Sequence, residues 1–143
     1  MTGVQTCALP IYHHTASNSY SDIDFKVVLK DEAQSATTGL IRVEEDALNC
    51  QAYQVNRNLL LNEGPKAESI PELEILCDQV QCSHGATVGP IDQEMLFYLM
   101  SRGVDYKEAM NIITLGYLEP TIEKFPADLG ELTRELLAIK MKG

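Results

Sequence analysis

The chain has 143 residues, enough for one modest domain, and 45% of them are hydrophobic. Its 11 Lys and Arg against 21 Asp and Glu give a net charge of -10, which argues against binding nucleic acid or anionic membranes, since both favour clustered basic residues. No apolar run of about 18 residues occurs, so no transmembrane helix is predicted, and the four irregularly spaced cysteines favour the reducing cytoplasm over a disulfide scaffold.

Residues 1–11 are predicted to be a non-native leader. They lack the basic start and apolar centre of a secretory signal, and they resemble translated adapter read-through at the start of assembled reading frames. We therefore leave this segment, with Cys7, out of the fold prediction and expect natural sequence to begin near Tyr12.

Residues 12–90 have the pattern of short strands separated by turns. Apolar residues alternate with Asp24 and Lys26 between Ile23 and Leu29, which is typical of a half-buried strand. Two further strands are expected at 38–43 and 52–61, each followed by a polar turn. Strand centres lie roughly ten to twenty residues apart without helical periods between them, which indicates a sandwich, a barrel or a solenoid.

The strand expected at 52–61 has two different faces. Tyr53, Val55 and Arg57 share one face, and Asn56 and Asn58 share the other. Asparagines stacked in successive turns of a solenoid can bond to one another through their amides, whereas Arg57 could orient the carboxylate of a partner. The sequence leaves both interpretations open.

The segment around 73–84 carries the residues suited to metal chemistry. Leu73, Ile75 and Cys77 share one face of a strand, and Cys82 and His84 then lie on one side of an extended run, roughly 7 Å apart at Cα. Thiolate and imidazole suit iron or zinc, so His84 is a candidate metal ligand, with Cys82 beside it and Cys77 as a weaker candidate. The alternative is that these cysteines are small buried hydrophobic residues.

After Gly89 and Pro90 the hydrophobic period changes to about 3.6 residues. A helix is expected over 91–102, a second with Asp105 as its N-cap and an end or kink at Pro120, and a third from about Asp128. Residues 91–143 are thus predicted to form a helical domain, and their apolar faces would pack together and cap the β unit.

Several motifs in one order resemble the SufB/SufD family, whose members are subunits of the SUF machinery that assembles iron–sulfur clusters. The likeness runs from about His14 to about Ile139. His84 is typical of the SufD-like branch, whereas SufB-like members carry an acidic residue at that place. The motifs are AYQ (52–54), NRNLLL (56–61), PELEI (71–75), CSHGATVG (82–89), IDQE (91–94), LFYL (96–99) and SRG (101–103).

The resemblance implies a mainly β fold with C-terminal helices. Residues 12–90 would be the last coils of a truncated, right-handed parallel β-helix, and residues 91–143 would be the small helical domain that caps it. The SufB branch also places an important Cys in the strand at 53–58, where this chain has Asn56. The chain would therefore lack one ligand of the shared site, which a partner would have to supply.

The same resemblance implies a cytoplasmic, non-catalytic scaffold. It would pair with a SufB-like subunit, or with itself, through the β-helix end, and would dock the SufC ATPase through helices within 92–125. A transient iron–sulfur cluster would form at the subunit interface with His84, Cys82 and, more weakly, Cys77, and ATP would bind only to SufC. The alternatives are a purely structural SufC-docking subunit, or a β-helix enzyme acting on polysaccharides, whose clustered carboxylates the strands lack.

Overall fold

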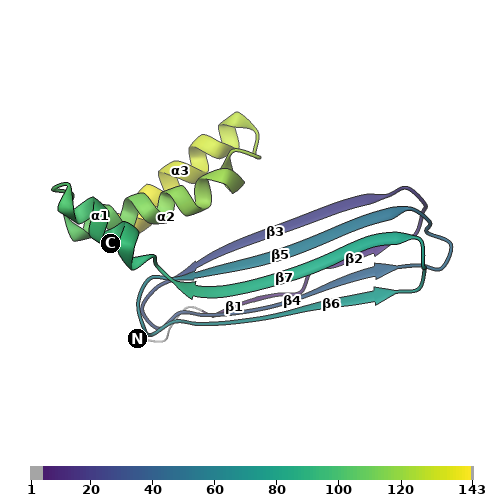
Figure 1. The fold of residues 1–143 in the computed structure, drawn as a ribbon. Coiled ribbons are helices and arrows are strands. Elements are labelled where there is room, and N and C mark those ends of the chain that lie inside the picture. Colours follow the sequence, from purple (N-terminus) through teal and green to yellow (C-terminus); the bar gives the residue numbers. More distant parts are fainter. Residues whose placement is uncertain (1–4, 143) are drawn as a thin grey trace. The chain divides into compact units, whose positions relative to one another are not determined.

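Strands make up the first part of the chain and helices the second, in a computed structural model that describes residues 5–142 (Figure 1). The predicted mainly β fold with C-terminal helices is confirmed. Residues 1–4 of the predicted leader lie outside the described residues. The elements are β1 (Gln5–Ala8), β2 (Ile11–His14), β3 (Tyr20–Leu29), β4 (Gln34–Val43), β5 (Cys50–Leu60), β6 (Lys66–Ile75), β7 (Val80–Pro90), α1 (Gln93–Ser101), α2 (Tyr106–Ile122) and α3 (Ala127–Lys142).

From β2 onward, successive strands alternate between two sheets. One sheet has the order β3-β5-β7, and in the other β4 pairs with β1, β2 and β6. All of these pairings are parallel, so the two layers in Figure 1 are built by a chain that crosses from one to the other after each strand. β1 falls within the predicted leader and pairs with β4, while its non-native origin stays a prediction.

The hydrophobic core of residues 1–90 lies between the two sheets. Ile23 of β3 meets Ile41 and Val43 of β4 there, and both β4 side chains are fully buried. Burial alternates along β4 residue by residue, as expected for a strand with one face in the core. Each fully buried aliphatic side chain contributes about 1.5–3 kcal/mol, so this cluster holds the two layers together.

The inward face of β5 is polar from Gln54 onward. Gln54, Asn56 and Asn58 are buried, whereas the alternating residues are half-buried on the outer face. Asn56 Nδ2 donates to Ser69 Oγ over 2.8 Å, and Asn58 Nδ2 donates to Asn56 Oδ1 over 3.3 Å. The register places Phe25 and Ala86 beside Asn56, so the predicted stacking of asparagines in successive strands is wrong. The amides of Asn56 and Asn58 bond instead within β5 and across to β6.

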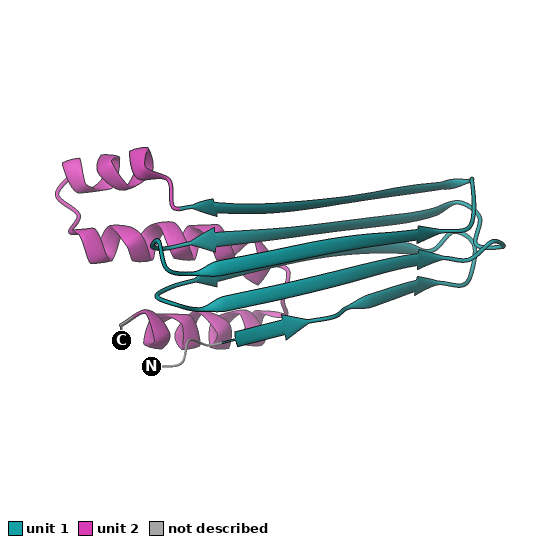
Figure 2. Cartoon of the chain, turned by 90° about the horizontal axis from the view of Figure 1, so that it is seen from below, with its two compact units in different colours: residues 1–90 teal, residues 91–143 magenta. Residues whose placement is uncertain are grey.

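Residues 91–143 form a second compact unit, coloured separately in Figure 2. Asp105 is the N-cap of α2, as predicted, and its carboxylate accepts hydrogen bonds from the backbone N–H groups of Lys107 and Glu108. Pro120 lies inside α2, which runs on to Ile122, and the Glu123 N–H still donates to the Glu119 carbonyl over 2.9 Å, so the helix does not end at Pro120 itself. None of the described helices is long and apolar enough to cross a membrane.

Candidate functional site

β7 places the predicted ligands in line with the interior of β5. The parallel register sets Cys82 beside Ala52 and His84 beside Gln54, and residues paired in this way share one face of the sheet. Gln54 is only 1% exposed, and its amide occupies the space next to Gly39, where a Cβ would lie 2.0 Å from Gln54 Nε2. His84 therefore holds an inward register position on the next strand.

The His84 side chain is nonetheless exposed to solvent. No strand in the described part of the chain pairs with the far edge of β7. The inward position of His84 is therefore left uncovered, whereas β5 covers the inward positions of β3 and β7 covers those of β5. No hydrogen bond from the ring to another described residue is found. The imidazole is thus open to a ligand or to a second chain.

Cys82 lies two residues before His84 on the same face and is half-buried. Burial raises the pKa of the Cys82 thiol, a backbone hydrogen bond with Ala52 opposes this rise, and nearby Cys50 adds to it. The thiol is therefore protonated at neutral pH. It would act as a sulfur ligand only if a metal ion displaced the proton.

Cys77 and Cys50 lie deeper than Cys82. Both are buried in the hydrophobic core cluster, and Cys82 packs against the same cluster. Cys50 Sγ donates to the backbone carbonyl of Ala47 over 3.1 Å and contacts Ser19 Oγ at 3.1 Å, so its thiol is engaged by the turns at this end of the strands. The structure therefore places Cys77 in this cluster and Cys82 against it, and of the three predicted site residues His84 is the most open to solvent.

Between residues 5 and 142, no group of three or more His, Cys, Asp and Glu side chains is arranged to hold a metal ion. His84 and Cys82 supply two donors of the kinds that iron and zinc prefer. A site with the usual four ligands would need the others from outside this group.

Arg57 is paired within the chain. It lies on the outer face of β5, where its Nη1 is 2.6 Å from Asp24 Oδ1 on β3. The side chain thus joins two neighbouring strands, which accounts for its position without a carboxylate from a partner.

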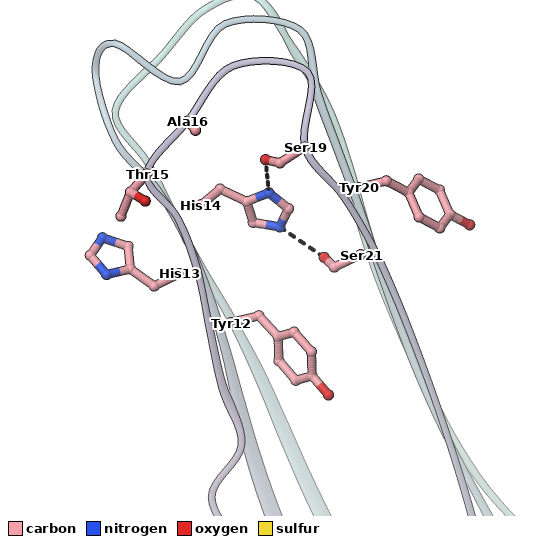
Figure 3. A pocket seen from close by; sticks show the side chains of 8 residues that line it. All are labelled: Tyr12, His13, His14, Thr15, Ala16, Ser19, Tyr20 and Ser21. Carbon is pink, nitrogen blue, oxygen red and sulfur yellow. Dashed lines mark hydrogen bonds between the residues drawn. The ribbon is translucent and has the colours of Figure 1, made fainter.

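A shallow pocket of about 270 Å³ surrounds His14, a residue that the sequence patterns did not identify (Figure 3). His14 is 6% exposed; its Nδ1 lies 2.6 Å from Ser19 Oγ and its Nε2 lies 2.8 Å from Ser21 Oγ. The available signal was a pair of serines two residues apart, Ser19 just before β3 and Ser21 within it. Because both ring nitrogens are satisfied internally, we interpret His14 as a structural residue. The pocket is lined by Tyr12, His13, His14, Thr15, Ala16, Ser19, Tyr20 and Ser21.

His14 gives the chain an acid-sensitive stability. Burial lowers the pKa of His14 below its ordinary value of 6.5, and the neighbouring His13 acts in the same direction. A histidine whose pKa is lowered by folding stabilises the folded state fully when the pH is above the pKa that it has in the unfolded chain. That stability is lost as the pH falls through its pKa in the folded state. We expect the urea midpoint to fall below about pH 6.5. The dependence of the urea midpoint on pH should become weaker in His14→Gln and stay the same in His84→Gln. An unchanged dependence in His14→Gln would contradict this assignment.

Comparison with known proteins agrees with the motifs. Residues 8–117 match the family described as SUF system FeS cluster assembly, SufBD core domain. The iron-sulfur cluster assembly protein SufD of Escherichia coli is 38% identical over 110 residues, which cover 77% of this chain and 24% of that protein. SufD of Bacillus subtilis is 37% identical over 101 residues, covering 71% and 23%. SufD of Plasmodium berghei is 33% identical over 117 residues, covering 81% and 9%. The chain spans no more than 24% of the length of these three curated relatives.

Proposed function

Since the chain belongs to the SufB/SufD family, we propose that it acts as a non-catalytic, cytoplasmic scaffold subunit in SUF iron–sulfur cluster assembly, with SufD-like character. One observation carries the proposal. His84 stands exposed on the last described strand, in an inward register position, with only Cys82 as a further donor on its face. Two donors of the right chemistry at an unpaired strand form a half-site that a second chain can complete.

The two parallel sheets fit a parallel β-helix, and we take its hand to be right. The alternation of strands between the sheets and the unbroken parallel register of β3, β5 and β7 support this fold. The end of such a solenoid presents the free edge of β7 together with His84. The SufB-like subunit, or a second copy of this chain, would then bind at that end and supply the missing ligands.

The helical unit would dock the SufC ATPase. Several large apolar and aromatic side chains on α1 and at the start of α2 are exposed, Phe97 most of all, and Arg102 stacks over the ring of Tyr98 at 5.2 Å. Aromatic residues, Met and Arg are the types enriched in protein interfaces. The exposed residues are Met95, Phe97, Tyr98, Met100 and Tyr106.

Residues 85–89 lie inside β7 rather than in a loop before a helix, so we place nucleotide binding on SufC alone.

The iron–sulfur cluster is cargo in this proposal. His84 would bind iron directly, and Cys82 would bind iron once its proton is displaced or accept sulfane sulfur from a persulfide of a partner, whose thiolate would leave, while the buried Cys77 is the weakest of the three candidates. A purely structural SufC-docking role is the second candidate, and it is favoured because no third His, Cys, Asp or Glu side chain of the described residues joins His84 and Cys82 in a metal-binding group. The two roles differ in whether any residue of β7 affects cluster formation.

The test uses a chimera in which residues 8–142 replace the matching segment of Escherichia coli SufD. Co-expressed with SufB-like and SufC-like partners and reconstituted anaerobically with iron and sulfide, the chimera should co-purify with both and show a cluster absorbance that is absent without it. A chimera that folds but binds neither partner would refute the scaffold role. We expect no activity of the chimera on acidic polysaccharides, with or without calcium.

A further inference from the structure

α3 has two faces with different surroundings. On one face, the buried Gly130 lies against Ile122 at the end of α2, and Arg134 forms an ion pair with Glu119. On another face, four large apolar side chains are each at least 50% exposed. α3 is thus held to α2 by one side and presents an apolar stripe on the other. The stripe consists of Leu129, Leu132, Leu136 and Ile139.

The stripe has the spacing of a coiled-coil seam. Its members follow one another at intervals of three, four and three residues, which corresponds to positions a, d, a and d of two heptads. An amphipathic helix that covers its apolar side inside a globular domain uses a wider stripe with e or g positions as well. The narrow a/d pattern therefore favours a second helix over a broad domain surface.

The charged residues beside the stripe indicate which helix would bind to it. Glu135 falls at position g on one side of the seam and Lys140 at position e on the other, and both are exposed. In a parallel pair of helices, position g of one chain faces position e of the next heptad in its partner. Two copies of α3 would therefore form two Glu135–Lys140 pairs by symmetry. In an antiparallel pair, Glu135 would instead face the same residue of the second copy.

We propose that α3 is a self-association helix that pairs in parallel with α3 of a second copy of the chain. The seam would bury both sets of apolar residues, and the flanking charges would fix the direction. Because α3 lies outside residues 92–125, which we assign to SufC, this inference stands independently of the proposed function. Two heptads form a short seam, so the dimer should be weak and depend on protein concentration.

Sedimentation equilibrium of the whole chain over a concentration series tests the pairing. Leu136→Glu places a charge in the seam of both copies and should weaken dimerisation about 100-fold. Ala138→Glu adds the same charge at an exposed position outside the seam and should leave the dimer unchanged. A chain that stays monomeric at every concentration overturns the proposal. So does a dimer that is insensitive to Leu136→Glu, because association would then occur elsewhere, for instance at the β7 edge.

A charge exchange tests the direction of the pair. Glu135→Lys and Lys140→Glu should each weaken the dimer about fivefold, because each creates like charges across the seam, and the double variant should restore it. Failure of the double variant to recover overturns parallel pairing. Circular dichroism should show unchanged helix content in all variants, since the substituted side chains are exposed.

Discussion

In the SufD chimera, His84→Ala should lower the yield of assembled iron–sulfur cluster at least about tenfold, a loss typical of altering a metal ligand or its support. The ring is exposed and hydrogen-bonded to no other described residue, so its removal takes away a donor without disturbing the core. The measurement is the visible absorbance of anaerobically reconstituted complex, normalised to protein and iron.

Two companion variants separate ligation from packing. His84→Cys keeps a soft donor at the same exposed position and should recover part of the yield. Ser83→Ala changes the neighbouring residue, which points to the opposite face of β7, and should have no effect. Cys82→Ser should cost less than His84→Ala, because the Cys82 thiol is half-buried and its pKa is raised. Full cluster yield from His84→Ala would leave the chain with a structural role only.

The sequence predicted the elements well where a local rule decides them. Asp105 lies at the N-cap of α2 because its side chain binds the first free N–H groups of the helix, a contact between residues two and three positions apart. The strand at 23–29 was likewise evident from its alternation. Such features need no knowledge of the rest of the chain.

The inward face of β5 could not be predicted from its hydrophobicity. Tyr53, Val55 and Leu59 point outward and are half-buried, whereas Gln54 and Asn56 point into the interior. The amides of Asn56 and Asn58 are tolerated because they bond to each other and Asn56 also bonds to Ser69 of β6, a contact that exists only after the two sheets have met. Whether a polar side chain of a strand can point into the interior between the sheets thus depends on tertiary contacts.

The candidate site was predicted only as far as its local geometry. Spacing placed Cys82 and His84 on one side of a strand, and the register agrees. Their different exposure depends on β7 being the last described strand of its sheet, which no pattern within 80–90 reveals. The contact of His13 could not be predicted from a local pattern either, because its Nε2 lies 2.6 Å from Oε1 of Glu44, which is 31 residues further along the chain.

Val88→Lys should weaken binding of the chimera to the SufB-like subunit about 100-fold, because a lysine directed inward at an open strand edge has to be desolvated without a partner when the edge pairs. Val88 lies in register with the buried Asn58, yet it is exposed, so it belongs to the surface that the second subunit would cover. The dissociation constant is measured by titrating the chimera against the immobilised partner.

Thr87→Lys provides the matched control, since it adds the same charge one residue away on the opposite face of β7. Its effect on binding should stay within about threefold, the range expected for a charge at the rim of an interface. Equal losses from the two variants would point to a general charge effect. Unchanged binding in Val88→Lys would separate the β7 edge from the interface, and His84 would then lack a route to ligands from a second subunit.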